Sequence, residues 1–333
     1  MSRCEPRGSV HAAGAWMRHR PRTIPPAMRS LRTLFVLALA ALLGACSLLP
    51  TAPTPPASSA PAASAAVEPP PPVARVLKVP RLGLALGGGA ARGFAHIGAI
   101  QVLEEQGIRP DLVVGTSAGS LVAALYASGK NGQELARLAE TMDEGAITDW
   151  SFPLKGLIKG EALARYVRAQ TGGKGIEQLA MPLGIVATQL ADGQGVVFRS
   201  GDLGQAVRAS SAVPAVFQPV SINGRLFVDG GLVAPVPVRH ARQMGAEVVI
   251  AIDISSPPKP DTRTDPFSLL MQTVAIMGRS INAHELREAE LVLRPDLSGV
   301  ASSDFTARRQ AIAAGRAAAL AALPRIKAVL APR

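Results

Sequence analysis

From residue 80 onward, short apolar runs alternate with longer stretches in which apolar residues recur at helical spacing. The apolar runs predict strands at 82–86, 111–115, 183–188, 196–198, 226–228 and 247–252. The helical spacing predicts helices at 94–106, 118–127, 132–142, 161–170, from 237 on, at 268–289 and at 306–320. Regular alternation of strand and helix indicates an α/β fold with a mainly parallel central sheet. Ligands of such sheets bind beyond the carboxyl ends of the strands, so the loops there are the first candidates for a functional site.

The apolar pattern before residue 80 is of a different kind. Residues 33–43 form an uncharged run that follows several arginines and precedes two small residues. The run is too short to span a bilayer, which needs about 20 residues, but it has the size of the apolar part of a secretory signal peptide. Residues 43–46 (LGAC) resemble the lipobox of bacterial lipoproteins, which implies cleavage before Cys46 and lipidation of that cysteine. The alternative is a plain signal peptide with a chance cysteine.

A proline- and alanine-rich stretch separates this run from the alternating pattern. Residues 50–72 hold nine Pro and seven Ala, with Glu68 as the only charge. Such a composition cannot bury a core and favours extended conformations, as in a tether. We therefore predict a leader and lipoprotein signal peptide over 1–45, a tether over 46–79 and one folded domain over 80–333.

Cysteine use and the residue after Cys46 bear on location. The other cysteine, Cys4, lies in the leader, so no disulfide and no cysteine-based metal site is available to the exported domain. Ser47 stands where Asp would be the usual inner-membrane retention signal in many Gram-negative bacteria. We expect a protein that is lipid-anchored in the bacterial cell envelope, in the outer membrane and facing the periplasm.

The net charge of +11 suggests nucleic-acid binding, but its distribution argues against it. Residues 1–45 hold seven Arg against one acid, and without them the excess falls to +5, which is ordinary for a soluble domain. Aromatic residues make up 4% of the chain and are not interleaved with basic ones, as a platform for single-stranded nucleic acid requires. We expect no nucleic-acid partner.

The most specific chemical signal lies between the strand at 111–115 and the helix at 118–127. Gly115, Ser117 and Gly119 fit the pattern G-x-S-x-G at this strand-to-helix turn. The tight turn strains its middle residue and requires small flanking residues. Ser117 would then project as a nucleophile at a helix N-terminus, where N–H groups favour developing negative charge. The alternative is a glycine- and serine-rich turn that only caps the helix.

A serine nucleophile needs a base, and one carboxylate is placed like one. Asp229 ends a predicted strand and is followed by Gly230 and Gly231, which let other backbone approach closely. An ordinary Asp-Gly turn is the alternative. A conventional triad would instead need a histidine to reach Ser117. After the leader, the chain has three histidines: His96, His240 and His284.

A third feature is the glycine-rich loop between the first predicted strand and helix. It contains Gly87, Gly88, Gly89, Arg92 and Gly93. The loop fails as a dinucleotide-binding G-x-G-x-x-G because Arg92 stands at the third glycine, and it fails as a P-loop because no lysine follows Gly93. Successive N–H groups in such a turn form an anion-binding nest, which suits the oxyanion of acyl transfer as well as it suits phosphate.

Over roughly 82–254, the glycine-rich loop, the G-x-S-x-G turn, the segment 207–214 (VRASSAVP) and the D-G-G motif resemble the bacterial branch of the patatin-like phospholipase family. The resemblance implies a three-layer α/β sandwich over 80–333 and a Ser-Asp dyad, with Ser117 as nucleophile and Asp229 as proton acceptor. It assigns the glycine-rich loop, together with the Ala118 N–H, to the oxyanion site. Which N–H groups point inward stays open, because the loop is one residue longer than in plant members.

The implied activity is hydrolysis of fatty esters of phospholipids or lysophospholipids in lipid catabolism, through an acyl-enzyme. It requires a membrane lipid as substrate, and neither metal nor small-molecule cofactor. Two alternatives remain: a non-catalytic lipid-binding or envelope-assembly module, and an acyltransferase with an acceptor other than water. Hydrolysis by a buried Asp also requires a raised pKa, because an unperturbed carboxylate is a weak base for a hydroxyl.

Weaker signals complete the sequence picture. His96 is either a support for the glycine-rich loop or a partner in a structural hydrogen bond, and we interpret His240 and His284 as surface residues. An apolar stretch at 150–158 is either core or a lipid-contact lid. Basic residues near the C-terminus could meet anionic head groups or form a solvated face: Arg308, Arg309, Arg316, Arg325 and Lys327.

Overall fold

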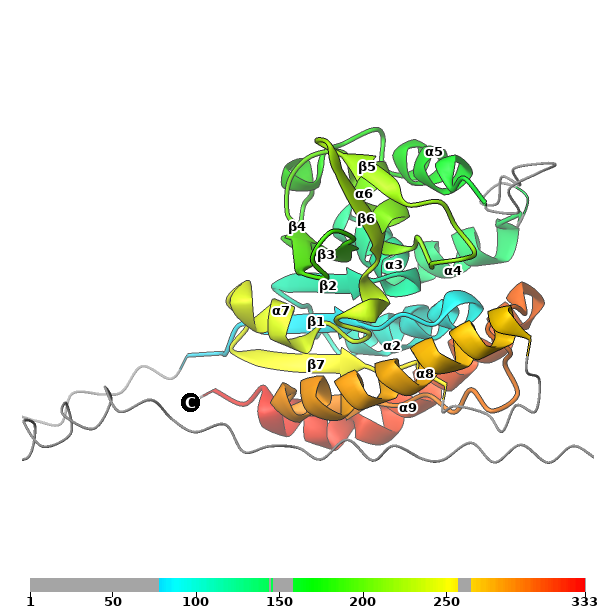
Figure 1. Ribbon diagram of the computed structural model, residues 1–333. Helices are drawn as coiled ribbons and strands as arrows, with labels where there is room; N and C mark the ends of the chain where they lie inside the picture. Colours follow the sequence, from blue (N-terminus) through cyan, green and yellow to red (C-terminus); the bar gives the residue numbers. More distant parts are fainter. Residues whose placement is uncertain (1–77, 144, 146–157, 257–264, 333) are drawn as a thin grey trace, which may run out of the picture. The chain divides into compact units, whose positions relative to one another are not determined.

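The computed structural model describes residues 78–143, 145, 158–256 and 265–332 (Figure 1). All of them belong to the unit Val73–Arg333. The predicted leader, the predicted tether up to residue 77 and most of the apolar stretch at 150–158 lie outside the described residues.

The described residues form an eight-stranded sheet in the order β5-β6-β3-β2-β1-β7-β8, with β4 paired to β3. β3, β2, β1, β7 and β8 run parallel, while β4, β5 and β6 are antiparallel to their neighbours. The bounds are β1 Leu82–Leu86, β2 Leu112–Thr116, β3 Leu183–Gln189, β4 Gly195–Phe198, β5 Val220–Ile222, β6 Arg225–Asp229, β7 Val248–Ile252 and β8 Leu291–Leu293. The predicted α/β fold with a mainly parallel sheet is thereby confirmed.

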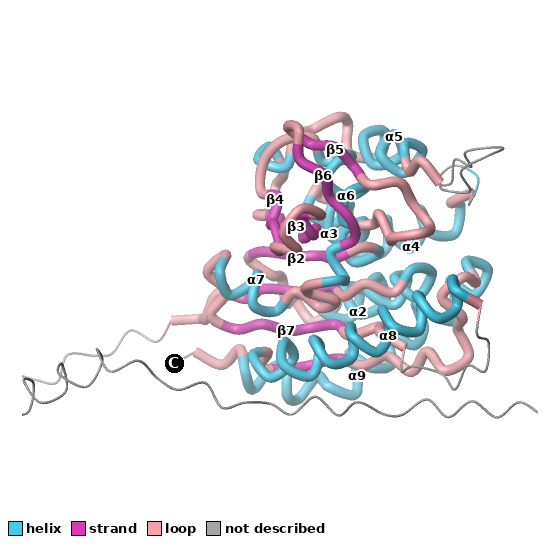
Figure 2. The backbone as a smooth tube through the Cα atoms, viewed as in Figure 1, coloured by secondary structure: helices cyan, strands magenta, loops and turns pink. Residues whose placement is uncertain are grey.

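Helices cover both faces of the sheet (Figures 1 and 2). The α-helices are α2 Phe94–Glu105, α3 Ala118–Ala127, α4 Gly132–Thr141, α5 Glu161–Gln170, α6 Leu203–Ser210, α7 Val238–Gln243, α8 Pro266–Glu285 and α9 Arg308–Val329. Short 3-10 helices include η2 Ala90–Gly93, η5 Gly230–Leu232 and η6 Leu286–Glu288. α2, α3 and α9 pack on one face, and α7 with the segment before it packs on the other.

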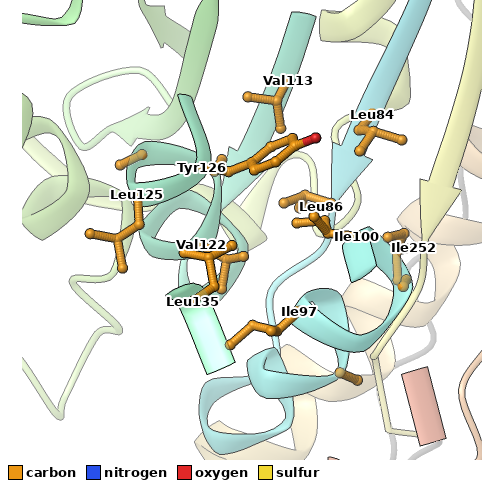
Figure 3. Close-up of a cluster of buried hydrophobic side chains, with 14 of the residues drawn as sticks. Leu84, Leu86, Ile97, Ile100, Val113, Val122, Leu125, Tyr126, Leu135 and Ile252 are labelled. Carbon is orange, nitrogen blue, oxygen red and sulfur yellow. The ribbon is translucent and has the colours of Figure 1, made fainter. Parts of the chain in front are cut away.

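The larger core lies between the sheet and α2, α3 and α4. Strand residues such as Leu84 and Leu86 meet Ile100 of α2 and Val122 of α3 there (Figure 3). Leu84, Leu86 and Ile100 are fully buried. Because β1 and β2 are buried on both faces, their apolar runs are continuous rather than alternating, as expected for central parallel strands. This core fixes the strand ends from which the site loops emerge.

Several elements differ from the sequence predictions. β5, β8 and α6 were not predicted, because runs of three apolar residues and a helix of eight give little periodic signal. α9 continues to Val329 although Pro324 lies inside it. Proline removes one helical hydrogen bond there, and burial of Ile326 in the core compensates for that loss.

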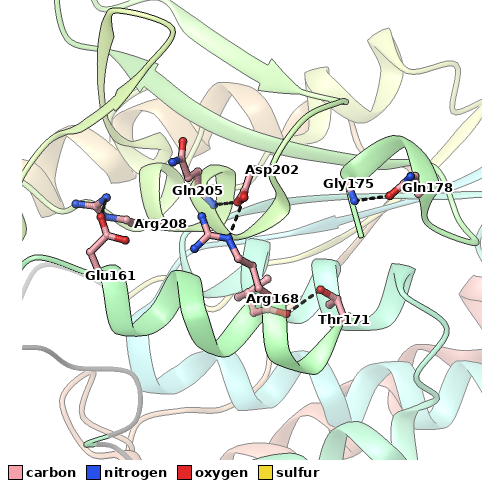
Figure 4. Close-up of polar contacts among 9 residues, drawn as sticks. Glu161, Arg168, Thr171, Gly175, Gln178, Asp202, Gln205 and Arg208 are labelled. Carbon is pink, nitrogen blue, oxygen red and sulfur yellow. Dashed lines mark hydrogen bonds and ion pairs between the residues drawn. The ribbon is translucent and has the colours of Figure 1, made fainter. Parts of the chain in front are cut away.

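Helices α5 and α6 are joined by ion pairs (Figure 4). Arg168 of α5 pairs with Asp202, the N-cap of α6, at 2.9 Å, and Asp202 also accepts from the Gln205 N–H. Arg208 of α6 pairs with Glu161 of α5 and donates to the Lys159 carbonyl at 2.9 Å. These contacts orient α6, whose last residue reaches the candidate site.

Candidate active site

Ser117 lies at the sharp turn between β2 and α3, as the sequence predicts. Its backbone has φ 53° and ψ −123°, a conformation that residues other than glycine rarely adopt. Such strain persists only where surrounding contacts impose it, and it is common at functional sites. Ser117 is partly exposed, whereas Thr116 before it is fully buried. The turn therefore presents the Ser117 side chain at the carboxyl edge of the sheet.

The two glycines of the motif are required by close backbone contacts. A Cβ on Gly115 would lie 2.4 Å from the Gly119 carbonyl oxygen. A Cβ on Gly119 would lie 2.1 Å from the Leu86 carbonyl oxygen. Neither distance is possible for real atoms, and the neighbours are backbone that cannot move aside. The elbow thus packs directly against the end of β1, where the glycine-rich loop begins.

Both backbone polar groups of Ser117 are held by serine hydroxyls. The Ser117 N–H donates to Ser210 Oγ at 2.9 Å, and Ser210 Oγ donates to the Val186 carbonyl at 2.6 Å. Ser120 Oγ donates to the Ser117 carbonyl at 2.6 Å. Ser210 was not singled out from the sequence, although the quoted segment 207–214 contains it. No local pattern marks it, because its partners lie in the turn after β2 and in β3.

Asp229 ends β6 and is almost fully buried, with 6% of its surface exposed. Burial raises the pKa of its carboxyl group from 3.8 to about 6, although the Gly231 N–H and the Ser117 side chain hydrogen-bond that group and oppose the rise. The Gly231 N–H donates to Asp229 Oδ1 at 2.6 Å. Packing requires a glycine at position 230, because a Cβ there would lie 2.2 Å from the Val186 carbonyl oxygen. The structure therefore brings Ser117 and Asp229 together.

The glycine-rich loop lies against the elbow. A Cβ on Gly88 would be 3.2 Å from Ser117 Cβ, and one on Gly93 would be 2.8 Å from Ala118 Cβ. The Gly87 and Gly88 N–H groups are engaged, since they donate to the carbonyls of Ile252 and Pro235 at 3.1 and 2.9 Å.

Two other N–H groups beside the elbow are open to a ligand. Within the part of the chain that the structure describes, those of Gly89 and Ala118 donate to no protein group. Both N–H groups are therefore available to a ligand that approaches Ser117.

Arg92 also belongs to the glycine-rich loop, but its guanidinium is directed elsewhere. The side chain is buried, and Nη1 donates to Ser256 Oγ beyond the end of β7. Burial lowers the pKa of this guanidinium, and the nearby Asp253 raises it. Arg92 thus ties the loop to the end of β7 through its side chain.

His96 supports the same loop. The ring is fully buried, and Nε2 lies 2.8 Å from the Gly87 carbonyl oxygen. Burial lowers its pKa to about 4, although that hydrogen bond and Asp253 oppose the change. The neutral ring therefore donates through Nε2 to Gly87. The two alternatives for His96 therefore coincide, because its structural hydrogen bond to Gly87 is what supports the glycine-rich loop.

The surface assignment holds for one of the other two histidines. His284 is exposed, but the prediction for His240 was wrong: it is 4% exposed, and burial lowers its pKa to about 4. The error arose because α7 is short and packs against β1 and β7, a tertiary contact that one turn of helical sequence does not reveal.

Most of the basic residues near the C-terminus hold α9 in place. Arg309 pairs with Glu140 at 3.2 Å, and Arg316 pairs with Glu105 at 2.7 Å. Arg308 donates to the Ala139 carbonyl at 2.7 Å. Arg325 and Lys327 are exposed.

The described ranges contain neither a metal-binding cluster nor a membrane-spanning helix. There, no group of three or more His, Cys, Asp and Glu side chains could hold a metal ion. No helix of that part of the chain is long and apolar enough to cross a membrane.

Comparison with known proteins agrees with this geometry. Residues 84–242 match the family model described as patatin-like phospholipase. An uncharacterized NTE family protein of Mycobacterium tuberculosis is 36% identical over 207 residues, which are 61% of this chain and 57% of the relative. The human patatin-like phospholipase domain-containing protein 6 is 36% identical over 205 residues, which are 59% of this chain and 15% of the relative. The chain thus spans less than two thirds of each of these relatives.

The fold has a solved counterpart in VipD from Legionella pneumophila. The similarity has a TM-score of 0.54 at 14% sequence identity and covers 74% of this chain and 67% of that chain. Residues 84–242 are therefore similar to a patatin-like phospholipase domain, and the chain has homologues in the NTE family.

Proposed function

We propose that this domain is a serine acyl hydrolase that cleaves fatty ester bonds of phospholipids or lysophospholipids. The observation that carries the proposal is the hydrogen bond between the Ser117 side chain and the buried Asp229 carboxyl group, whose pKa is raised to about 6. A base with that pKa is ionised at neutral pH and still accepts a proton more readily than an ordinary aspartate. The match of 84–242 to patatin-like phospholipases supports a lipid ester as substrate.

The positions of these groups support the following reaction. Asp229 takes the proton of Ser117 as Oγ attacks the ester carbonyl carbon, and the carbonyl oxygen becomes an oxyanion. The open N–H groups of Gly89 and Ala118 stabilise that charge at the N-terminus of α3. Collapse of the intermediate breaks the ester bond, and Asp229 returns the proton to the departing alcohol or lysolipid. Water, activated by Asp229, then hydrolyses the acyl-Ser117 ester.

A lipid panel tests the proposal. Fatty-acid release from phospholipids and lysophospholipids is measured for the wild type, Ser117→Ala and Asp229→Ala, with a chelator present in parallel reactions. We expect release by the wild type alone, unchanged by the chelator. Equal slow release by the wild type and Ser117→Ala would exclude the enzyme. Transfer of the acyl chain to an added acceptor instead of water would identify an acyltransferase.

We also propose that Cys46 is lipidated and anchors the domain in the cell envelope, at the outer membrane and facing the periplasm. This proposal rests on the apolar run at 33–43 and the LGAC segment at 43–46. Cys46→Ser should abolish metabolic labelling by a fatty-acid analogue, and labelling that survived the substitution would refute the anchor.

A further inference from the structure

A polar cavity lies close to the candidate active site. It has a volume of about 540 Å³ and is lined by residues that follow β7, by the last turns of α8 and by Arg287 and Arg294 around β8. In the sheet, β1 separates β7 from β2, which leads to Ser117. At about 4.8 Å per strand, the cavity is displaced from the elbow by roughly 10 Å along the sheet edge. Arg92 links the two places, since it belongs to the glycine-rich loop and contacts Ser256 in the cavity wall.

The cavity carries an excess of positive charge. Its wall contains three arginines, Arg279, Arg287 and Arg294, and one acid, Asp253. Arg294 pairs with Asp253 at 3.4 Å. Arg279 and Arg287 have no acidic partner within the described part of the chain, and both are exposed to an incoming ligand. Two unpaired guanidinium groups that face one concavity attract an oxyanion with several acceptor oxygens.

The inner wall is polar as well. Asn282 is 4% exposed, and its Nδ2 lies 3.5 Å from Ser255 Oγ. Ser255 Oγ in turn donates to Asp253 Oδ1 at 2.6 Å, so its hydroxyl proton is used. Asn282 Nδ2 has a second proton, and Oδ1 has no partner in the structure. A buried amide with an open donor and an open acceptor can bind a polar ligand at this wall.

An apolar stripe leads along α8 to this cavity. Leu269 and Ile276 are 50% and 55% exposed, although both are large and apolar. Residues seven apart lie on the same side of a helix, so Leu269, Ile276 and Ala283 form one row. Ala283 is part of the cavity wall, and Arg279 lies one turn beyond Ile276. The row therefore joins an exposed apolar surface to a cationic concavity.

We propose that this cavity binds the phosphate group of a phospholipid, with an acyl chain along the Leu269–Ile276 row. Arg279 and Arg287 bind the phosphate oxygens, and the Asn282 amide contacts the polar head group. A free phosphate anion shares the cationic part of this recognition but makes no use of the apolar row. The proposal goes beyond hydrolysis, because binding here needs neither Ser117 nor Asp229.

Binding is measured with full-length protein that carries Ser117→Ala, so that no lipid is consumed. One arm titrates inorganic phosphate by calorimetry, and the other sediments the protein with vesicles of phosphatidylcholine and phosphatidylglycerol at fixed ionic strength. The test pair is Arg279→Gln with Arg287→Gln. The matched control is Arg325→Gln with Lys327→Gln, which removes the same charge from the exposed end of α9. Every variant has the same chain before residue 78, so the contribution of that part to vesicle binding is constant.

We expect the test pair to weaken both phosphate and vesicle binding roughly tenfold, the effect of losing charge-assisted hydrogen bonds. The control pair should change neither. Leu269→Gln with Ile276→Gln should weaken vesicle binding and leave phosphate binding intact.

Two outcomes would overturn the proposal: vesicle binding that is unaffected by the test pair, and vesicle binding that falls only in the control pair. In the first case, a loss of phosphate binding alone would assign the cavity to a free anion. In protein with Ser117 intact, the test pair should leave hydrolysis of a short soluble ester unchanged, so failure of the hydrolase proposal is seen separately.

Discussion

The amide N–H of Ser117 donates to the hydroxyl of Ser210 at 2.9 Å, across 93 residues of sequence. Ser210 ends α6, and α6 is held by ion pairs to α5. The same hydroxyl donates to the Val186 carbonyl on β3. The strained turn is therefore fixed from outside the elbow, by a helix that the G-x-S-x-G pattern does not include. This contact predicts that Ser210 positions the nucleophile without touching a substrate.

Ser210→Ala should lower kcat much more than it changes KM. The variant leaves the Ser117 N–H and the Val186 carbonyl unpaired, which costs about 1–3 kcal/mol in the free energy of unfolding. A small displacement of Ser117 should lower kcat roughly 100-fold. Ester hydrolysis and urea unfolding check both numbers.

Ser211→Ala is the matched control, because no hydrogen bond of its hydroxyl is found in the described structure and it is only partly buried. It should leave both quantities near the wild-type values. Equal effects of the two substitutions would show that the contact with Ser117 does not position the nucleophile.

Ester hydrolysis should decline as the pH falls through about 6. Burial raises the pKa of Asp229 to about 6, and the base must be ionised to accept the Ser117 proton. Below that pH, kcat/KM should fall about tenfold per pH unit. A pH profile measured on a soluble ester checks this. A plateau that extends down to the ordinary carboxyl value of 3.8 would contradict the assignment of Asp229 as base.

Asp229→Asn should remove activity and yet stabilise the fold at neutral pH. Because the folded-state pKa is raised, the folded protein binds this proton more tightly than the unfolded chain does. The contribution of the Asp229 carboxyl group to stability is therefore present below pH 3.8 and is lost as the pH rises to about 6. The asparagine avoids that loss, so the free energy of unfolding should increase by up to about 3 kcal/mol at neutral pH. Urea unfolding at several pH values should show this difference vanish near 3.8; a variant less stable at every pH would contradict it.

Gly119→Ala should destabilise the protein by about 3 kcal/mol and abolish hydrolysis. Its new Cβ would lie 2.1 Å from the Leu86 carbonyl oxygen, so the elbow and β1 would have to separate. Gly278→Ala on α8 is the control, since the nearest atom to its Cβ is Pro235 Cγ at 3.7 Å. This change should be neutral or stabilising by up to about 1 kcal/mol, because alanine favours a helix. Thermal unfolding that ranks the two variants the other way would refute the packing argument.

His96→Phe should change how stability depends on acid. Burial lowers the pKa of His96 from 6.5 to about 4, so the stability it supports is present above 6.5 and is lost as the pH falls toward 4. The phenylalanine should cost about 1–3 kcal/mol at neutral pH, because the Gly87 carbonyl loses its donor. It should also remove this part of the acid decline. If the free energy of unfolding of His96→Phe fell between pH 6.5 and pH 4 by as much as that of the wild type, a group other than His96 would titrate there.

The sequence was informative where chemistry and local structure coincide. The strand-turn-helix pattern around Ser117 and the strand end at Asp229 are local, and both lie where the pattern predicted them. The motif also anticipates the close packing of Gly115 and Gly119, whose neighbours belong to the same turn or to the end of the adjacent strand β1.

Other features depend on pairing between distant segments. Ser210, the buried position of His240 and the engagement of Gly88 by Pro235 all arise from contacts that no local period encodes. Arg92 was assigned to the oxyanion loop, and its backbone does lie there, but its guanidinium contacts Ser256 at the end of β7. Side-chain direction at a loop is set by the tertiary fold, so it could not be predicted.

The most direct test of the central claim is covalent trapping of the nucleophile. The wild type, Ser117→Ala and Asp229→Asn are incubated with a serine-directed organophosphorus reagent, and the modified peptide is identified by mass spectrometry while ester hydrolysis is followed. We predict an adduct on Ser117 alone, loss of hydrolysis in step with its formation, and slow labelling of Asp229→Asn. An adduct on another residue, or full hydrolysis by Ser117→Ala, would contradict the assignment of Ser117 as the nucleophile.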